Sequence, residues 1–362
     1  MMKKVKKGSA IIALLALVLS TVVIPKAYAA LAVDTGRENC SIELNVAKNV
    51  TTGDVVFEEL EKLPVKVNLY KMATIDVAGR YKAVKEAYES LKLEEVNSET
   101  EAAEWEAKAL AAKELVKDTE ADATVTLVNG TGTATGLKTG MYLVVPQEIE
   151  SADYAYTFKP YLISLPNNYY TEENQDDTWV YNLVGANAIG LKPAYEDRYG
   201  DLVIEKDLKS FNATVGGATF VFQVEAVKDY SAVGGEKDVK VYSDVVALTF
   251  DAAGKQSLTI EKIPAGAVVT VTEIYSGGSY KVTGSGEFET VILANEAYDQ
   301  VVEETTEEVE TATATVTFVN DYDGSLNGGT GVVNHFEAKV IDEESGTIVW
   351  DWANAPELDV AE

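Results

Sequence analysis

The chain has 362 residues, of which 59 are acidic and 30 are basic, giving a formal net charge of −29 at pH 7. This charge argues against nucleic acid or an anionic membrane surface as a partner, because surfaces that bind phosphate must be basic. One cysteine, Cys40, and one histidine, His335, exclude an intramolecular disulfide and a zinc site built from these side chains, so we expect no cofactor and no metal.

The first 29 residues predict a secretory signal peptide. Residues 3–7 contain four lysines, residues 11–24 are mostly apolar, and Ala27-Tyr28-Ala29 matches a small-x-small cleavage site. The leader has five lysines and no acid, so the remaining chain carries 25 basic and 59 acidic residues, a net charge of −34. We expect cleavage near Ala29 and a secreted or cell-surface protein that is not an integral membrane protein once processed.

Residues 30–195 predict a first β domain that contains one helix. Val65–Lys71 alternates apolar and polar residues, as a half-buried strand does. Residues 98–117 are rich in Ala, Glu, Lys and Leu and predict a helix, with Ser98 and Glu101 as a capping box. Strand patterns resume at residues 123–128, 140–145 and 157–165.

Residues 196–325 predict a second β domain without a helix. Its expected strands cover residues 202–206, 218–227, 239–250, 257–263, 267–274 and 312–320. Tyr195–Asp201 is expected to be a polar link. Residues 299–310, with six acids and no base, are expected to form a solvated loop or a poorly ordered strand edge.

Residues 326–362 predict a C-terminal tail with a hairpin over residues 336–341 and 347–352. The expected fold class is therefore mainly all-β. We expect two tandem immunoglobulin-like β-sandwich domains, the first with an inserted α-helix.

Three polar residues share the apolar faces of three expected strands. Lys206, Glu273 and Asn320 end the patterns Leu202–Lys206, Val269–Glu273 and Val316–Asn320, in which every second residue before them is apolar. Side chains two residues apart in a strand face the same way, so an amine, a carboxyl group and a carboxamide point into one core. Burying them is costly unless they serve one another.

These three groups are the components of a self-forming amide. Burial favours the neutral forms of both Lys206 and Glu273. The neutral amine can then attack the carboxamide carbon of Asn320, while protonated Glu273 donates to the carboxamide oxygen and carries protons to the leaving ammonia. The alternative is a buried Lys206–Glu273 ion pair with Asn320 as a hydrogen-bond partner. In the first domain, Lys48, Lys66 or Lys71 with Asn182 and Glu148 form only a weak candidate set.

The motifs around these residues resemble a known family. Leu202-Val203-Ile204-Glu205-Lys206, Val271-Thr272-Glu273 and Thr317-Phe318-Val319-Asn320-Asp321-Tyr322 resemble the isopeptide-forming domains of Gram-positive pilins and Cna B-type domains. Residues 67–71, 136–144 and 160–166 resemble a pilin N-terminal domain. The resemblance implies a fimbrial subunit or surface adhesin in which Lys206 is joined to Asn320 with Glu273 as the catalytic acid.

The resemblance also implies a lysine that a sortase joins to the next subunit. Lys192 lies near the expected place, but the tyrosine-proline-lysine motif around it is missing, so an ordinary interdomain lysine stays open. The printed C-terminus has no L-P-x-T-G sequence, and we expect no sortase linkage through it. The implied partners are other pilin subunits at Lys192 and a host protein or glycan.

Two further functions stay open. A non-polymerising extracellular adhesin could bind a host protein or glycan through its tyrosines, among them Tyr154, Tyr156, Tyr161, Tyr169, Tyr170 and Tyr181. A carbohydrate-active enzyme could use a pair of carboxylates, but so many acids produce pairs by chance. We therefore expect no enzyme beyond the single intramolecular reaction.

Overall fold

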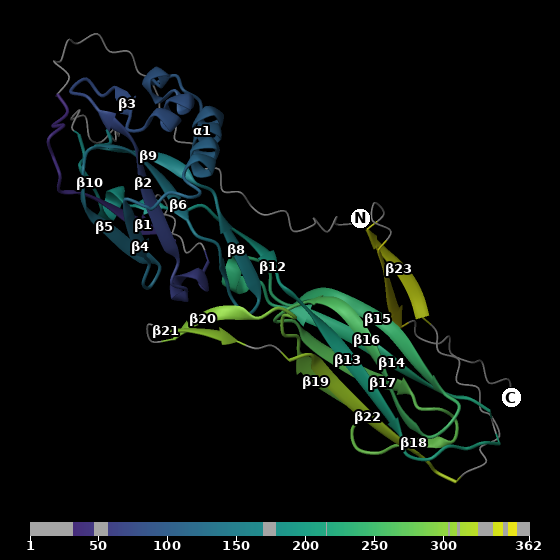
Figure 1. Cartoon of the computed structure of the whole chain (residues 1–362). Helices are drawn as coiled ribbons and strands as arrows, with labels where there is room; N and C mark the ends of the chain where they lie inside the picture. Colours follow the sequence, from purple (N-terminus) through teal and green to yellow (C-terminus); the bar gives the residue numbers. More distant parts are fainter. Residues whose placement is uncertain are drawn as a thin grey trace.

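The computed structural model describes residues 32–46, 57–168, 179–214, 216–302, 305–309, 312–324, 336–342 and 347–352. The expected signal peptide lies outside these residues. Within them, no helix has the length and apolar character needed to cross a membrane. The chain forms two β-rich bodies placed end to end, with β8 (Tyr154–Phe158) and β12 (Pro193–Asp197) lying between them (Figure 1).

The first body contains three sheets. The first sheet pairs β1 (Cys40–Asn45) with β5 (Thr131–Leu137), β10 (Asn182–Leu183) and β11 (Ile189–Gly190). The second has the order β3 (Tyr81–Ala83), β2 (Lys66–Ile75), β6 (Gly140–Pro146) and β9 (Tyr161–Leu165), with β4 (Ala123–Thr126) also on β2. The third has the order β12, β8 and β7 (Ile149–Glu150).

Both faces of the second sheet are covered, which explains why its central strand β6 is one continuous apolar run. On one face, Leu69 and Val144 belong to the main core of the first body. On the other face, Met72 and Leu143 pack with residues of helix α1 (Ala102–Leu115). The inserted helix is thus confirmed, and it closes the outer side of the sheet.

The helix begins later than the sequence predicts. The capping box expected from Ser98 and Glu101 is wrong: Glu101 itself is the N-cap residue, and no side chain caps the helix. Before the helix, residues 98–99 form a turn and Glu101 has an extended backbone. The buried side of the helix is narrow and consists of Ala109 and Ala112, which allow the helix to lie close to the sheet.

The second body is a sandwich of two four-stranded sheets. One sheet has the order β16 (Gly254–Pro264), β13 (Tyr199–Leu208), β22 (Ala314–Tyr322) and β18 (Tyr280–Val282). The other has the order β15 (Val239–Phe250), β14 (Ala218–Lys228), β17 (Val268–Tyr275) and β19 (Glu287–Val291). Apolar residues of both sheets form one core. The prediction of a mainly β protein built as β-sandwiches is confirmed.

Two further hairpins lie outside the sandwich. β20 (Tyr298–Val302) pairs with β21 (Thr305–Val309), and β23 (Phe336–Asp342) pairs with β24 (Thr347–Trp352). Of the two forms expected for residues 299–310, a solvated loop or a strand edge, the first pair corrects the loop, because residues 299–302 and 305–309 form paired strands.

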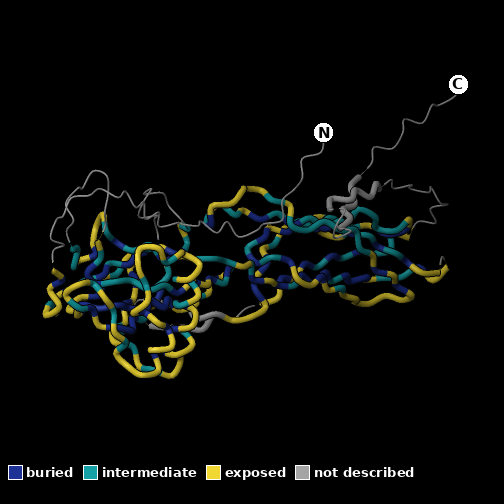
Figure 2. Tube along the Cα trace, turned by 90° about the horizontal axis from the view of Figure 1, so that it is seen from above, coloured by how far each residue is buried: buried dark blue, intermediate teal, exposed yellow. Residues whose placement is uncertain are grey.

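The polar link expected at Tyr195–Asp201 is also wrong. Strand β12 ends at Asp197 and strand β13 begins at Tyr199, so Arg198 alone stands between a strand of the first body and a strand of the second. Figure 2 shows buried residues inside both bodies and also at the narrow junction between them. The connection is therefore packed structure and not a solvated tether.

Candidate functional site

The three polar residues singled out in the sequence meet inside the second body. Lys206 lies on β13, Asn320 lies on the adjacent parallel strand β22, and Glu273 lies on β17 of the facing sheet. Asn320 is directly opposite Leu208, so Lys206 is its diagonal neighbour on the same inward face. The two sheets therefore bring the amine and carboxamide together from one side and the carboxyl group from the other.

Each group contacts the other two. The Nζ of Lys206 donates to Asn320 Oδ1 at 2.6 Å and to Glu273 Oε2 at 2.8 Å. The Nδ2 of Asn320 donates to Glu273 Oε1 at 2.7 Å. The side chains of Lys206 and Glu273 have no exposed area, and Asn320 is fully buried. Every charged or polar group of the site is thus satisfied within the site and without solvent.

Aromatic rings surround the amine. The Nζ of Lys206 lies 4.5 Å from the ring centre of Phe220, 5.6 Å from Phe222 and 5.8 Å from Phe318. These rings attract an ammonium ion weakly but remove the water that would solvate it. The loss of hydration is the larger effect, since it costs several kcal/mol for a buried ion whereas a cation–π contact returns roughly 0.5–2 kcal/mol.

Burial shifts both titrating groups toward their neutral forms. Desolvation lowers the pKa of Lys206, opposed by its hydrogen bond and charge interaction with Glu273. Desolvation raises the pKa of Glu273, opposed first by Lys206 and then by Asn320. The ion pair and the neutral pair contain the same number of protons. One proton moving from Nζ to Oε2 converts the first into the second and creates a nucleophilic amine.

The contacts of Glu273 differ from the sequence prediction in one respect. The sequence predicts a hydrogen bond from protonated Glu273 to the carboxamide oxygen of Asn320, whereas in the structure Glu273 Oε1 accepts from the carboxamide nitrogen. One carboxyl oxygen faces the amine that must lose protons, and the other faces the nitrogen that must leave. Glu273 is therefore placed to carry protons from nucleophile to leaving group.

Lys192 lies outside this site, in the first body. It stands between β11 and β12 of the first body and is exposed. Its carbonyl oxygen accepts a hydrogen bond from the Lys159 backbone N–H at 3.3 Å, and its Nζ is 5.9 Å from the ring centre of Tyr161. The backbone at Lys192 is thus held in place while its amine is open to solvent.

The described members of the weak candidate set in the first domain, Lys66, Lys71, Asn182 and Glu148, form no hydrogen bond or ion pair with one another. The side-chain oxygen of Asn182 accepts from Ser41 Oγ at 3.0 Å, and Lys66 and Glu148 are exposed. Lys48 lies outside the described residues. Among the described residues of the first body we find no lysine placed against Asn182.

Tyrosines proposed to line a binding surface are partly in the core. Tyr154 and Tyr156 are 2% and 0% exposed, so they cannot contact a ligand on the surface. Tyr161 and Tyr181 are half-buried, and Tyr169 and Tyr170 lie outside the described residues. Tyr154 and Tyr156 alternate with Ala155 on strand β8, and aromatic residues are as typical of strand cores as of binding sites.

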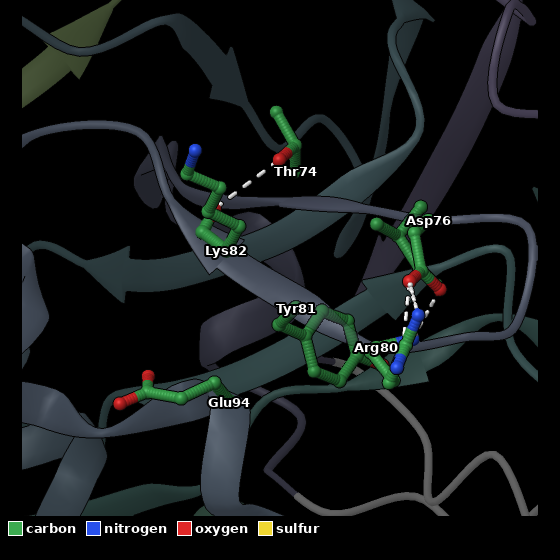
Figure 3. A pocket seen from close by; sticks show the side chains of 7 residues that line it. Thr74, Asp76, Arg80, Tyr81, Lys82 and Glu94 are labelled. Carbon is green, nitrogen blue, oxygen red and sulfur yellow. Dashed lines mark hydrogen bonds and ion pairs between the residues drawn. The ribbon is translucent and has the colours of Figure 1, made fainter.

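The described surface also has a hollow of about 430 Å³ in the first body (Figure 3). Two carboxylates line it, Asp76 and Glu94. Hydrogen bonds from Arg80 and Ala78 hold the pKa of Asp76 below its usual value, the backbone N–H of Arg80 having the largest effect. A general acid of a glycosidase needs a raised pKa, so this hollow offers no support for a carbohydrate-active enzyme. Within the described chain, no cluster of His, Cys, Asp or Glu is arranged to hold a metal ion.

Comparison with known proteins agrees with the limits of the second body. A family model described as a domain of unknown function, DUF5979, matches residues 202–323. This stretch is about a third of the chain and includes Lys206, Glu273 and Asn320. The curated proteins contain no match to the sequence.

Solved structures to which the chain is similar include Gram-positive pilins. GBS52, the minor pilin of Streptococcus agalactiae, is 14% identical, with 82% of this chain and 100% of that chain covered and a TM-score of 0.22. The major pilin SpaD of Corynebacterium diphtheriae is 12% identical, with 80% and 99% covered and a TM-score of 0.25. The shaft pilin SpaA of Lactobacillus rhamnosus GG is 13% identical, with 80% and 100% covered and a TM-score of 0.26.

Proposed function

We propose that the chain is an extracellular structural subunit of the fimbrial type, whose second domain is closed by an amide bond between Lys206 and Asn320. The observation that carries this proposal is the three-way contact of Lys206, Glu273 and Asn320 in a core without water. A lysine, a carboxyl group and a carboxamide satisfy one another there, and these contacts support one role for each in the same reaction.

The reaction proceeds without an external reagent. A proton moves from Lys206 Nζ to Glu273, and the neutral amine attacks Cγ of Asn320, forming the C–N bond while the carbonyl electrons move to Oδ1. Glu273 takes a second proton from Nζ and delivers one to Nδ2. The bond from Cγ to Nδ2 then breaks, the carbonyl re-forms, and ammonia leaves. The fold supplies the proximity, which can lower the barrier by roughly 7–11 kcal/mol.

The strand geometry gives this bond a structural purpose. β13 leads from the first body into the sandwich, and β22 leads out of it toward the C-terminal part of the chain. The amide would close a loop of 114 residues between these two parallel strands. In the loop-entropy treatment of cross-links, a loop of this size stabilises the fold by about 4–5 kcal/mol. A pull on both ends would pass through the amide and bypass the rest of the sandwich.

Polymerisation through Lys192 is the second part of the proposal. Its exposed amine and fixed backbone suit it as an acceptor for the C-terminal carbonyl of another subunit that a sortase has activated. No turnover on an outside substrate is proposed, since the intramolecular reaction occurs once in each chain. Extracellular placement follows from the leader sequence and the strongly acidic mature chain.

Peptide mapping tests the amide directly. Digestion of the protein should yield one branched peptide in which the Lys206 side chain is joined to the Asn320 side chain. The matched control is Lys209→Ala, which removes an exposed lysine on the same end of the sandwich and should leave the branched peptide in place. Recovery of Lys206 and Asn320 in separate, unmodified peptides would refute the proposal.

A further inference from the structure

A second buried lysine lies on the same inward-facing row of β14 that supplies Phe220 and Phe222. Lys228 ends this strand and is 1% exposed. Its Nζ lies 2.7 Å from Asp197 Oδ1, the last residue of β12. Since β12 pairs with β8 of the first body, this ion pair joins a strand of one body to a strand of the other.

Both oxygens of Asp197 have partners. Oδ1 accepts from Lys228, and Oδ2 accepts from the Tyr230 hydroxyl at 2.9 Å. The Nζ of Lys228 also lies 4.1 Å from the ring centre of Tyr154, which belongs to the first body, and 5.0 Å from that of Tyr230. A carboxylate and two tyrosine rings thus surround the amine of Lys228.

The setting differs from that of Lys206 in the group that faces the amine. Asn320 offers Lys206 a carboxamide with a third group, Glu273, at its leaving nitrogen. Asp197 offers Lys228 a carboxylate whose other oxygen is bound by a phenol. The Lys228 amine therefore faces no carboxamide, and its contact with Asp197 is an ion pair.

A second buried basic residue, Arg198, contacts both bodies at the same junction. Arg198 is 7% exposed and stands between β12 and β13. Its guanidinium donates to the carbonyl of Ser151 in the first body at 2.6 Å and to the carbonyl of Ala297 in the second at 3.2 Å. The short fork of Arg198 thus holds loops of both bodies at the one residue that separates the two strands.

A loop of the second body also completes the core of the first. Val233, in the short helix that follows β14, is 4% exposed and belongs to the main apolar core of the first body. The Glu58 N–H donates to the carbonyl of Ala232 at 3.0 Å. Lys228 precedes this loop. The two bodies therefore contact each other at Arg198 and at Val233 as well as at Lys228.

We infer that the Lys228–Asp197 ion pair, supported by Arg198, is a lock that fixes the two domains in one orientation. Domains joined by exposed linkers move relative to one another by default, unless the interface holds them. Here the linker is one buried residue, Arg198. The residue before it, Asp197, is paired with the buried Lys228 of the second body. This lock depends on the geometry of the junction and not on the proposed amide.

The experiment measures the distance between the domains in the full chain. Spin labels are placed at Glu89→Cys and Glu261→Cys, which are exposed and lie in different bodies, in a chain carrying Cys40→Ala. We expect a single narrow distance distribution by pulsed electron spin resonance. Lys228→Met keeps the apolar stem but removes the charge, and Asp197→Asn keeps the shape of the partner. Either change should lose the single narrow peak.

The matched control is Lys240→Met, which breaks the Lys240–Glu225 pair between β15 and β14, within the second body, and should leave the peak unchanged. Near-UV circular dichroism verifies that each variant is folded. A peak in Lys228→Met and in Asp197→Asn as narrow as in the parent would overturn the inference. A Lys228–Asp197 cross-linked peptide with loss of water, about 18 Da, would also overturn it, because the pair would then be covalent.

Discussion

The Nζ of Lys206 lies 2.6 Å from Oδ1 of Asn320, across two neighbouring parallel strands and with neither side chain exposed to solvent. Parallel strands at the two ends of a domain are the elements that a pull on the chain would separate first. An amide bond between Lys206 and Asn320 would join these two strands covalently, so that a pull could not separate them. Glu273 lies beside the two groups, with one carboxyl oxygen at the amine and the other at the carboxamide nitrogen.

Replacing Glu273 by Gln should give a folded protein that fails to form the amide. Gln keeps the size of the side chain but can neither take a proton from Nζ nor deliver one to Nδ2. Peptide mapping should then recover Lys206 and Asn320 unlinked. Glu289→Gln, an exposed carboxylate on the neighbouring strand β19, is the control and should leave the amide intact. Efficient cross-linking in Glu273→Gln would remove the proposed role of Glu273.

Replacing Asn320 by Ala should lower the free energy of unfolding of the second domain by about 4–5 kcal/mol, the entropic contribution of the cross-link. This variant keeps the Lys206–Glu273 ion pair, so its loss of stability isolates the cross-link better than a change at Lys206 does. Denaturant unfolding measures the difference, with Asn182→Ala in the first domain as the control.

Limited proteolysis gives a second measure of the same effect. In the wild type we expect cleavage first at the exposed connector after α1, residues 118–122, and a resistant core over about residues 202–323. Lys206→Ala should lose that resistance. Equal digestion rates for wild type and Lys206→Ala would show that the amide, even if present, does not protect the domain.

The Glu273→Ala variant should become more stable as pH rises above neutrality. Without Glu273, burial lowers the pKa of Lys206 with no carboxylate to oppose it. The unfolded chain then binds a proton that the folded chain lacks, so stability increases between the folded pKa and the ordinary value of 10.5, by up to about 1.4 kcal/mol per pH unit.

Urea unfolding at several pH values checks this slope. The double variant Glu273→Ala with Lys206→Met is the control, because it contains no buried amine. The cross-linked wild type should also lack the rise, since its amide nitrogen does not titrate. Parallel stability curves for Glu273→Ala and the double variant would contradict the proposed desolvation of Lys206.

Lys192→Ala should abolish sortase-dependent adducts between subunits while leaving the intramolecular amide intact. Gel electrophoresis under denaturing conditions, with the secreting cells as the source, separates covalent multimers from single chains. Lys159→Ala, which removes a neighbouring lysine paired with Glu106, is the control and should leave the multimers unchanged. Multimers that persist in Lys192→Ala would place the acceptor lysine elsewhere.

The alternation of apolar residues was enough to predict the sandwich and to place Lys206, Glu273 and Asn320 on inward faces. It could not show that β17 lies in the sheet opposite to β13 and β22, because pairing between distant strands is set by the packed core. The same limit explains the wrong prediction that Glu273 would contact the carboxamide oxygen. Which end of a carboxamide a carboxyl group reaches depends on the rotation of the carboxamide about its Cβ–Cγ bond, which no sequence pattern records.

The alternation of apolar residues also indicates a second inward-facing lysine, Lys228, which the sequence analysis did not identify. Lys228 shares parity with Phe220 and Phe222, as Lys206 does with Leu202 and Ile204. The alternation of apolar residues therefore identifies both Lys206 and Lys228 as inward-facing. Which of them can form an amide and which an ion pair depends on the groups that contact each amine. Those partners, Glu273 with Asn320 in one case and Asp197 in the other, come from distant strands and become visible only in the fold.

The intact mass of the mature protein tests the central claim most directly. Amide formation between Lys206 and Asn320 expels one ammonia, so the purified chain should be lighter than its sequence mass by about 17 Da, and Asn320→Ala should show its full sequence mass. A wild-type mass equal to the sequence mass, in a folded protein kept at neutral pH, would contradict the amide and leave Lys206, Glu273 and Asn320 as a buried hydrogen-bonded ion pair.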